Sequence, residues 1–147
     1  MLQTYNLFQQ LPPESKVWYY LSDRKLAKDE NDWVMKKLIE FSNNWNSHGQ
    51  KLDSDATILL NQIVILASDE TKISASGCSI DTSVHLIKEI GKEINVDFFN
   101  RLNVLIVKEN DYILDTYSTI RKTKGIKYFN PLVSNLHELR NNWLIES

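Results

Sequence analysis

Two extended apolar runs, at residues 56–60 and 63–67, are separated by only Asn61 and Gln62. Aliphatic and β-branched residues joined by so short a connection predict two antiparallel strands and a tight hairpin. This hairpin limits the fold strongly, because one helical pattern precedes it and a second follows it. The chain is therefore expected to form an antiparallel sheet with helices packed against it.

A strand and a helix are expected before the hairpin. Residues 17–21 are rich in β-branched and aromatic side chains, which favours a strand. Apolar residues at helical spacing then predict an amphipathic helix over residues 29–45. Gly49 is placed to cap the C-terminus of this helix, and His48 stands in its last turn, where a cation is favoured.

A second helix is expected after the hairpin, over residues 81–94, with Asp81 as its N-cap. A last, short helix is expected to begin at Ser134, which is placed to cap it. The strands expected in the C-terminal half lie at residues 103–107, 112–114 and 127–129.

This order of elements predicts an α+β fold. It fits a two-layer sandwich with a ferredoxin-like β-α-β-β-α-β core and a C-terminal strand and helix extension. The two helices of such a core run antiparallel, so His48 and Gly49 are expected to meet the segment that precedes the second helix. No linker, repeat or low-complexity tract divides residues 1–147, which indicates a single domain.

The composition narrows the classes of function. The formal net charge is -2, which gives no overall field to attract nucleic acid or an anionic membrane. No apolar run approaches the ~20 residues that a membrane-spanning helix needs, and the N-terminal residues lack a secretory signal pattern. A single cysteine excludes an internal disulfide. A protein of the reducing cytoplasm is the resulting expectation.

Residues 74–85, Ser-Ala-Ser-Gly-Cys-Ser-Ile-Asp-Thr-Ser-Val-His, hold that cysteine and one of three histidines. Cys78 would be a thiol nucleophile with His85 or His48 as the base. Asp81 and His85 are spaced i, i+4, so the carboxylate is placed to orient the imidazole. A small thiol-dependent enzyme of acyl transfer or hydrolysis is therefore one hypothesis. The alternative, which the sequence favours, is that Cys78 is a small packed side chain.

The same segment also has the chemistry of an anion-binding loop. Hydroxyls and glycine at a helix N-terminus bind phosphate or carboxylate groups, and Arg101 is a further candidate for contacting a carboxylate. The candidate ligand-binding residues within the segment are Ser76, Gly77, Ser79, Thr82 and Ser83. The alternative is that these residues only cap the helix and form the turn before it.

No metal site and no cofactor are expected. His48, Cys78, Asp81 and His85 offer suitable ligand atoms, but no paired spacing such as Cys-x-x-Cys or His-x-x-x-His accompanies them.

Four segments, at residues 45–50, 68–70, 75–85 and 96–102, resemble a family of small uncharacterised bacterial proteins, many of which carry the label "ABC transporter ATPase". The most specific segment is Ser-Gly-Cys-Ser-Ile-Asp. The label implies nucleotide hydrolysis, which needs the phosphate-binding pattern Gly-x-x-x-x-Gly-Lys-Ser/Thr. The chain has only four glycines and lacks this pattern. The resemblance therefore implies a shared site at the cysteine segment and no particular reaction.

No complete catalytic set is visible in the sequence. The main hypothesis is therefore a non-catalytic binding or adaptor module that uses residues 74–85 to bind a protein partner or a small anionic ligand.

Overall fold

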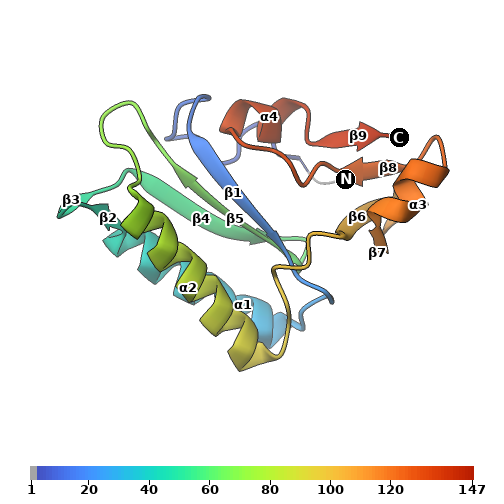
Figure 1. The fold of residues 1–147 in the computed structure, drawn as a ribbon, viewed down its shortest axis with the longest axis horizontal. Coiled ribbons are helices and arrows are strands. Elements are labelled where there is room, and N and C mark those ends of the chain that lie inside the picture. Colours follow the sequence, from blue (N-terminus) through green and yellow to red (C-terminus); the bar gives the residue numbers. More distant parts are fainter. Residues whose placement is uncertain (1–2) are drawn as a thin grey trace.

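An antiparallel sheet forms the centre of the N-terminal half in the computed structural model, which describes residues 3–147. Its three strands are β1 (Lys16–Leu21), β4 (Ser54–Leu59) and β5 (Ile63–Ser68). Their order is β1-β5-β4, and each neighbouring pair is antiparallel. Helices α1 (Lys28–Asn44) and α2 (Gly77–Ile94) cover one face of this sheet (Figure 1).

The hairpin expected between residues 56 and 67 is confirmed, although its turn differs by one residue. The turn is centred on Leu60 and Asn61, both with φ of 56°, and the Gln62 N–H donates to the Leu59 carbonyl at 3.0 Å. Two successive residues with positive φ match the right-handed twist of the flanking strands. Leu60 adopts this conformation although it is uncommon for a side chain of its kind.

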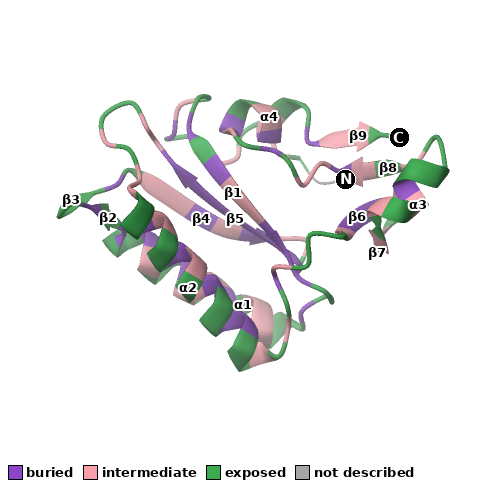
Figure 2. Ribbon diagram, in the orientation of Figure 1, coloured by how far each residue is buried: buried purple, intermediate pink, exposed green. Residues whose placement is uncertain are grey.

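Strand β5 is the most buried element, because both of its faces are covered (Figure 2). Val64 and Leu66 pack under the two helices. Ile63, Ile65 and Ala67 point to the other face, where they pack against apolar side chains from the C-terminal half. Alternate residues of one strand thus belong to two apolar clusters, which explains why the run is continuously apolar.

A second, four-stranded sheet occupies the C-terminal half, in the order β7-β6-β8-β9. Two short helices accompany it. The bounds are β6 (Asn103–Lys108), β7 (Asp111–Thr116), α3 (Tyr117–Lys122), β8 (Lys127–Phe129), α4 (Leu136–Asn141) and β9 (Leu144–Glu146). The fold is therefore mixed α and β with several antiparallel sheets. No helix within residues 3–147 has the length and apolar character needed to cross a membrane.

The ferredoxin-like topology is not confirmed. The order β1-β5-β4 is the order that the first three strands of a ferredoxin-like core would have. The fourth strand of such a core would pair with β1, but the corresponding strand, β6, lies in the second sheet. Both edges of β6 are already paired, with β7 and β8. The free edge of β1 is covered instead by the segment before α4, where the Val17 N–H donates to the Ser134 carbonyl at 3.0 Å and Lys16 bridges to Asn135.

Two helices begin at residues other than those expected. The N-cap of α2 is Ser76, whose hydroxyl accepts a hydrogen bond from the Ser79 N–H at 3.1 Å. The prediction that Asp81 caps this helix is wrong, because helical backbone starts four residues earlier, at Gly77. Helix α4 is capped by Asn135, whose side chain accepts from a first-turn N–H at 2.9 Å, and Ser134 lies just outside.

An ion pair joins the start of α1 to the end of α2. The Arg24 guanidinium contacts both carboxylate oxygens of Glu30, at 2.8 and 2.7 Å, and also donates to the Ile94 carbonyl at 2.6 Å. The Glu30 carboxylate accepts a further bond from the Ala27 N–H at 2.9 Å. The bond from Arg24, followed by the bond from Ala27, lowers the pKa of Glu30 to about 2 from its ordinary value of 4.5.

This shift predicts how stability depends on pH. A carboxyl whose pKa is depressed in the folded state stabilises the fold above its unfolded pKa, and the contribution is lost as pH falls through the folded value. We therefore expect the melting temperature to fall between pH 4.5 and about pH 2 partly through Glu30. Glu30→Gln should melt lower than wild type at neutral pH and lose less on acidification, as followed by circular dichroism. Identical pH profiles for both proteins would contradict this.

Candidate functional site

A short hairpin follows α1 and carries His48 at its tip. Its strands are β2 (Asn46–Ser47) and β3 (Gln50–Lys51). His48 and Gly49 are the two turn residues, with φ of 51° and 80°. The expectation that Gly49 caps α1 is wrong, since α1 ends at Asn44. The glycine is needed for the left-handed backbone of a two-residue hairpin turn and not for a helix end.

Two hydrogen bonds, one buried and one partly buried, fasten this hairpin to the first turn of α2. The indole N–H of Trp45 donates to the Ser79 carbonyl at 2.8 Å. The Ser79 hydroxyl donates to the Asn46 carbonyl at 2.7 Å. Trp45 and Ser79 are almost fully buried, so the bond from the indole is shielded from water. The hairpin tip is therefore held beside the residues that precede and begin α2.

An open groove of about 470 Å³ lies between the hairpin and the start of α2. We call it the hairpin groove. Phe41 and Trp45 contribute apolar surface, and the other lining residues are polar or small. Its lining residues are Phe41, Asn44, Trp45, Asn46, His48, Gly49, Ser76, Cys78, Ser79 and Thr82. The expected meeting of His48 and Gly49 with the cysteine segment thus occurs, although through a hairpin tip and not a helix end.

The hydroxyls expected to bind a ligand are largely engaged within the protein. The Ser76 and Ser79 hydroxyls lie 2.8 Å apart, in addition to their capping and hairpin bonds. Thr82 donates to the Cys78 carbonyl at 2.9 Å, and the buried Ser83 donates to the Ile80 carbonyl at 2.6 Å. These side chains shape the groove and the helix start. The first-turn donors that remain within residues 3–147 are the Gly77 and Cys78 N–H groups, because the Ser79 N–H is capped by Ser76 and the Ile80 N–H donates to the Ser76 carbonyl.

Cys78 is exposed, so the expectation of a packed cysteine is wrong. It shares the hairpin groove with His48, which is also exposed. Asp81 and His85 are exposed on α2 but do not line the groove, and no hydrogen bond joins them among the residues that the structure describes. The expected set of Cys78, His48, Asp81 and His85 is therefore brought together only in part. Gly77 lies beside the groove and not in its lining.

No metal-binding cluster accompanies this site. Within residues 3–147 no group of three or more His, Cys, Asp or Glu side chains is arranged to hold a metal ion.

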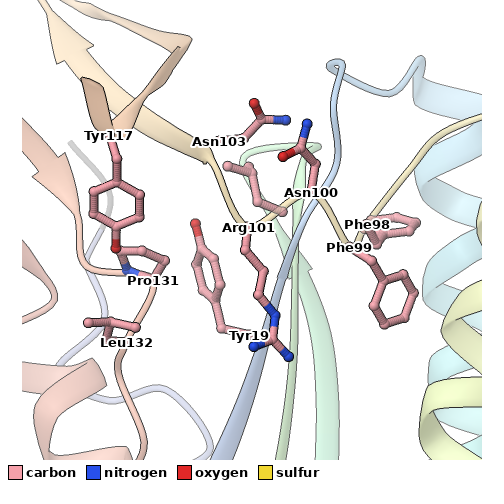
Figure 3. Close-up of a pocket in the computed structure, with 10 residues that line it drawn as sticks. Tyr19, Phe98, Phe99, Asn100, Arg101, Asn103, Tyr117, Pro131 and Leu132 are labelled. Atoms are coloured by element: carbon pink, nitrogen blue, oxygen red, sulfur yellow. The ribbon is translucent and has the colours of Figure 1, made fainter. Parts of the chain in front are cut away.

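A second pocket, of about 250 Å³, contains Arg101, the remaining candidate ligand-binding residue. We call it the junction pocket, because strand β1, the segment after α2 and the C-terminal sheet meet there (Figure 3). Tyr19 and Tyr117 also line it, and sequence reasoning did not single them out. Tyr19 follows the pattern of a strand residue, and what distinguishes it from a core side chain is that its hydroxyl has no hydrogen-bond partner within residues 3–147.

Comparison of the chain with protein-family models, with curated proteins and with solved structures finds no match. The resemblance of residues 76–81 to small bacterial proteins labelled "ABC transporter ATPase" therefore stays a prediction, and the hairpin groove and the junction pocket carry the functional argument.

Proposed function

We propose that this protein is a non-catalytic binding module that binds an anionic group in the hairpin groove. The observation that carries the proposal is that the groove opens at the first turn of an 18-residue helix, α2. A helix of this length presents unpaired N–H groups and a partial positive charge at its N-terminus. A carboxylate or phosphate group is the natural acceptor for such donors.

The lining of the groove supports this reading. Among its ten lining residues there is no Asp, Glu, Lys or Arg. The Glu70 carboxylate accepts the Ala75 N–H, one residue before the N-cap Ser76, and within residues 3–147 no side chain accepts from the Gly77 or Cys78 N–H. Asp81, which would repel an anion, is exposed outside the lining. His48 at the rim adds a donor to the groove. The partly exposed Phe41 adds an apolar surface against which the rest of a ligand would pack.

The anionic group has two candidate sources, a small free ligand or a carboxylate of a partner protein, and one titration distinguishes them. The amide resonances of isotope-labelled protein are followed by NMR while acetate, phosphate or a short aspartate-containing peptide is added. We expect the Gly77 and Cys78 amides to shift in a saturable way. Tighter binding of the peptide than of acetate would identify a protein partner, and the reverse order would identify a small ligand.

Helix α1 supplies an internal control. Unlike the first turn of α2, which has no acidic residue, the first turn of α1 carries the carboxylates of Asp29 and Glu30, and these repel a further anion. Its first-turn amides should therefore not respond to any of the three probes. If no probe shifts Gly77 and Cys78, or if both helix termini shift equally, the groove is not an anion site.

A second function stays open because Cys78 is exposed in the same groove as His48. A thiol-dependent enzyme would use Cys78 as the nucleophile and His48 as the base. Cys78→Ser separates the two functions in the same titration. The binding module keeps its amide shifts with serine, whereas a thiol enzyme loses its rapid reaction with an electrophile such as iodoacetamide at neutral pH.

The proposal includes a location in the reducing cytoplasm. An exposed free cysteine supports it, because a reducing compartment keeps such thiols from oxidative pairing. It also includes a relationship of residues 16–94 to ferredoxin-like folds, which the strand order β1-β5-β4 and the two helices on one face support.

A further inference from the structure

The junction pocket has features of a ligand site that are separate from the hairpin groove. Its walls come from three parts of the chain that are distant in sequence. Tyr19 belongs to β1, Arg101 to the segment after α2, and Tyr117 and Leu132 to the C-terminal half (Figure 3). Its volume of about 250 Å³ lies just below the range of roughly 300–1,000 Å³ common for small-molecule sites. A compact ligand is therefore the right size.

The hydroxyl of Tyr19 is a buried donor without an acceptor. The oxygen is buried, and no hydrogen-bond partner for it occurs within residues 3–147. Burial, and to a smaller extent the Tyr117 hydroxyl, raises the pKa of Tyr19, so the group stays protonated and able to donate. A buried polar group without a partner is uncommon, because its desolvation is uncompensated. The hydroxyl thus indicates where an acceptor atom of a ligand would lie.

Arg101 supplies the charge of this pocket. Its side chain is exposed, and no carboxylate pairs with it in the part of the chain that the structure describes. In the view of Figure 3 the side chain runs alongside the Tyr19 ring, with the guanidinium at the end of the ring away from the hydroxyl. A guanidinium binds carboxylate oxygens through two parallel hydrogen bonds. The pocket therefore offers a cation at one end and a neutral donor at the other.

Apolar surface also lines this pocket. The Tyr19 ring forms part of it, and Leu132 lines the same pocket with 77% of its surface exposed. An exposed leucine at the mouth of a pocket would be covered by the carbon chain of a bound molecule. A ligand that fits all three features has a carboxylate, a short carbon chain and a second oxygen acceptor.

We propose that the junction pocket binds a small oxo-carboxylic acid, with the carboxylate on Arg101 and the second oxygen accepting a hydrogen bond from Tyr19. The Tyr117 hydroxyl faces the same region and is a further donor to that oxygen. This site is independent of the proposed function, since it shares no lining residue with the hairpin groove.

Three probes test the two contacts separately. Levulinate has both oxygens in place, valerate lacks the oxo group, and methyl levulinate lacks the charge. We expect wild-type protein to bind levulinate about tenfold more tightly than valerate, because one hydrogen bond from a buried donor is at stake. Methyl levulinate should bind roughly 10- to 100-fold more weakly than levulinate, because a charge-assisted contact is lost.

Two variants assign these differences to residues. Tyr19→Phe should bind levulinate and valerate equally, and its melting temperature without ligand should equal or exceed that of wild type, since an unpaired buried hydroxyl is removed. Arg101→Gln changes an exposed side chain and should weaken both carboxylates without affecting the fold. A loss of binding in Tyr19→Phe through misfolding would show as a lower melting temperature without ligand.

Amide resonances locate the binding. Shifts at residues 100–103 and 117 report binding in the junction pocket, whereas shifts at 77 and 78 report binding in the hairpin groove. The two proposals can therefore be refuted separately. The proposal is overturned if levulinate gives no saturable shift at the junction pocket. It is also overturned if wild type binds levulinate and valerate equally, or if both variants keep wild-type affinity.

Discussion

Replacing Gly91 with alanine should lower the free energy of unfolding by about 1–3 kcal/mol, although alanine is the better helix former by about 1 kcal/mol. A Cβ at this position would lie 2.6 Å from the carbonyl oxygen of Val96. That carbonyl belongs to the chain reversal that ends α2, where Asn95 has a φ of 58° and the Val96 N–H donates to the Gly91 carbonyl at 2.8 Å. Backbone held by such a bond cannot move aside cheaply.

Gly77→Ala is the matched control. Gly77 lies in the same helix, and a Cβ there would meet no atom within 4 Å. This variant should be as stable as wild type or more stable by a few tenths of a kcal/mol, as expected for a helical glycine without steric restraint. Urea denaturation of both variants measures the difference. If Gly91→Ala is as stable as Gly77→Ala, the close approach to Val96 does not restrict residue 91.

The elements that sequence periodicity could predict are those whose side chains are buried in a regular pattern. Strand β5 alternates between two apolar clusters, and α1 and α2 present apolar faces to one sheet, so all three were found close to their actual positions. The pairing of β6 could not be predicted in the same way. Its neighbour is the later strand β8 and not β1, and this choice between segments distant in sequence leaves no periodic signal.

The start of α2 shows a different limit. Ser76, Ser79, Asp81 and Ser83 all have side chains that can cap a helix, so residue type alone does not select among them. Ser76 is the cap because its hydroxyl reaches the Ser79 N–H, while Ser79 is held in place by Trp45 from another part of the chain. The cap is thus fixed by a tertiary contact, and Cys78 moves from the expected loop into the first helical turn.

The two pockets differ in how far sequence could foresee them. The hairpin groove was anticipated because antiparallel helices bring residues 48 and 78 to one end of the sheet, although two-residue strands are too short to give a pattern of their own. The junction pocket was foreseen only at Arg101. The proposed role of Tyr19 depends on its hydroxyl having no hydrogen-bond partner within residues 3–147, and only the folded structure reveals this.

Trp45→Phe is expected to cost about 2 kcal/mol of stability and to loosen the β2–β3 hairpin, which the bond from the Ser79 hydroxyl to the Asn46 carbonyl alone then joins to α2. The substitution removes the indole N–H that donates to the Ser79 carbonyl at 2.8 Å, and it leaves space where the larger ring was. Trp45 is only 3% exposed, so neither water nor a small rearrangement replaces the lost contact easily. The Trp45 ring also packs on Trp18 and Phe41, at centroid distances of 5.4 and 5.1 Å.

Trp33→Phe distinguishes this effect from a general loss of tryptophan. Trp33 lies on α1 and is only partly buried, and its indole donates no hydrogen bond within residues 3–147, so the change should cost less than about 1 kcal/mol. Urea denaturation gives the two stabilities, and amide resonances of residues 46–51 report the hairpin. Equal stabilities and an unchanged hairpin in both variants would show that the Trp45 bond does not position the hairpin.

Anion binding at Gly77 and Cys78 should weaken in Trp45→Phe alone, because the hairpin that lines one side of the groove is then held less firmly while the helix terminus is unchanged.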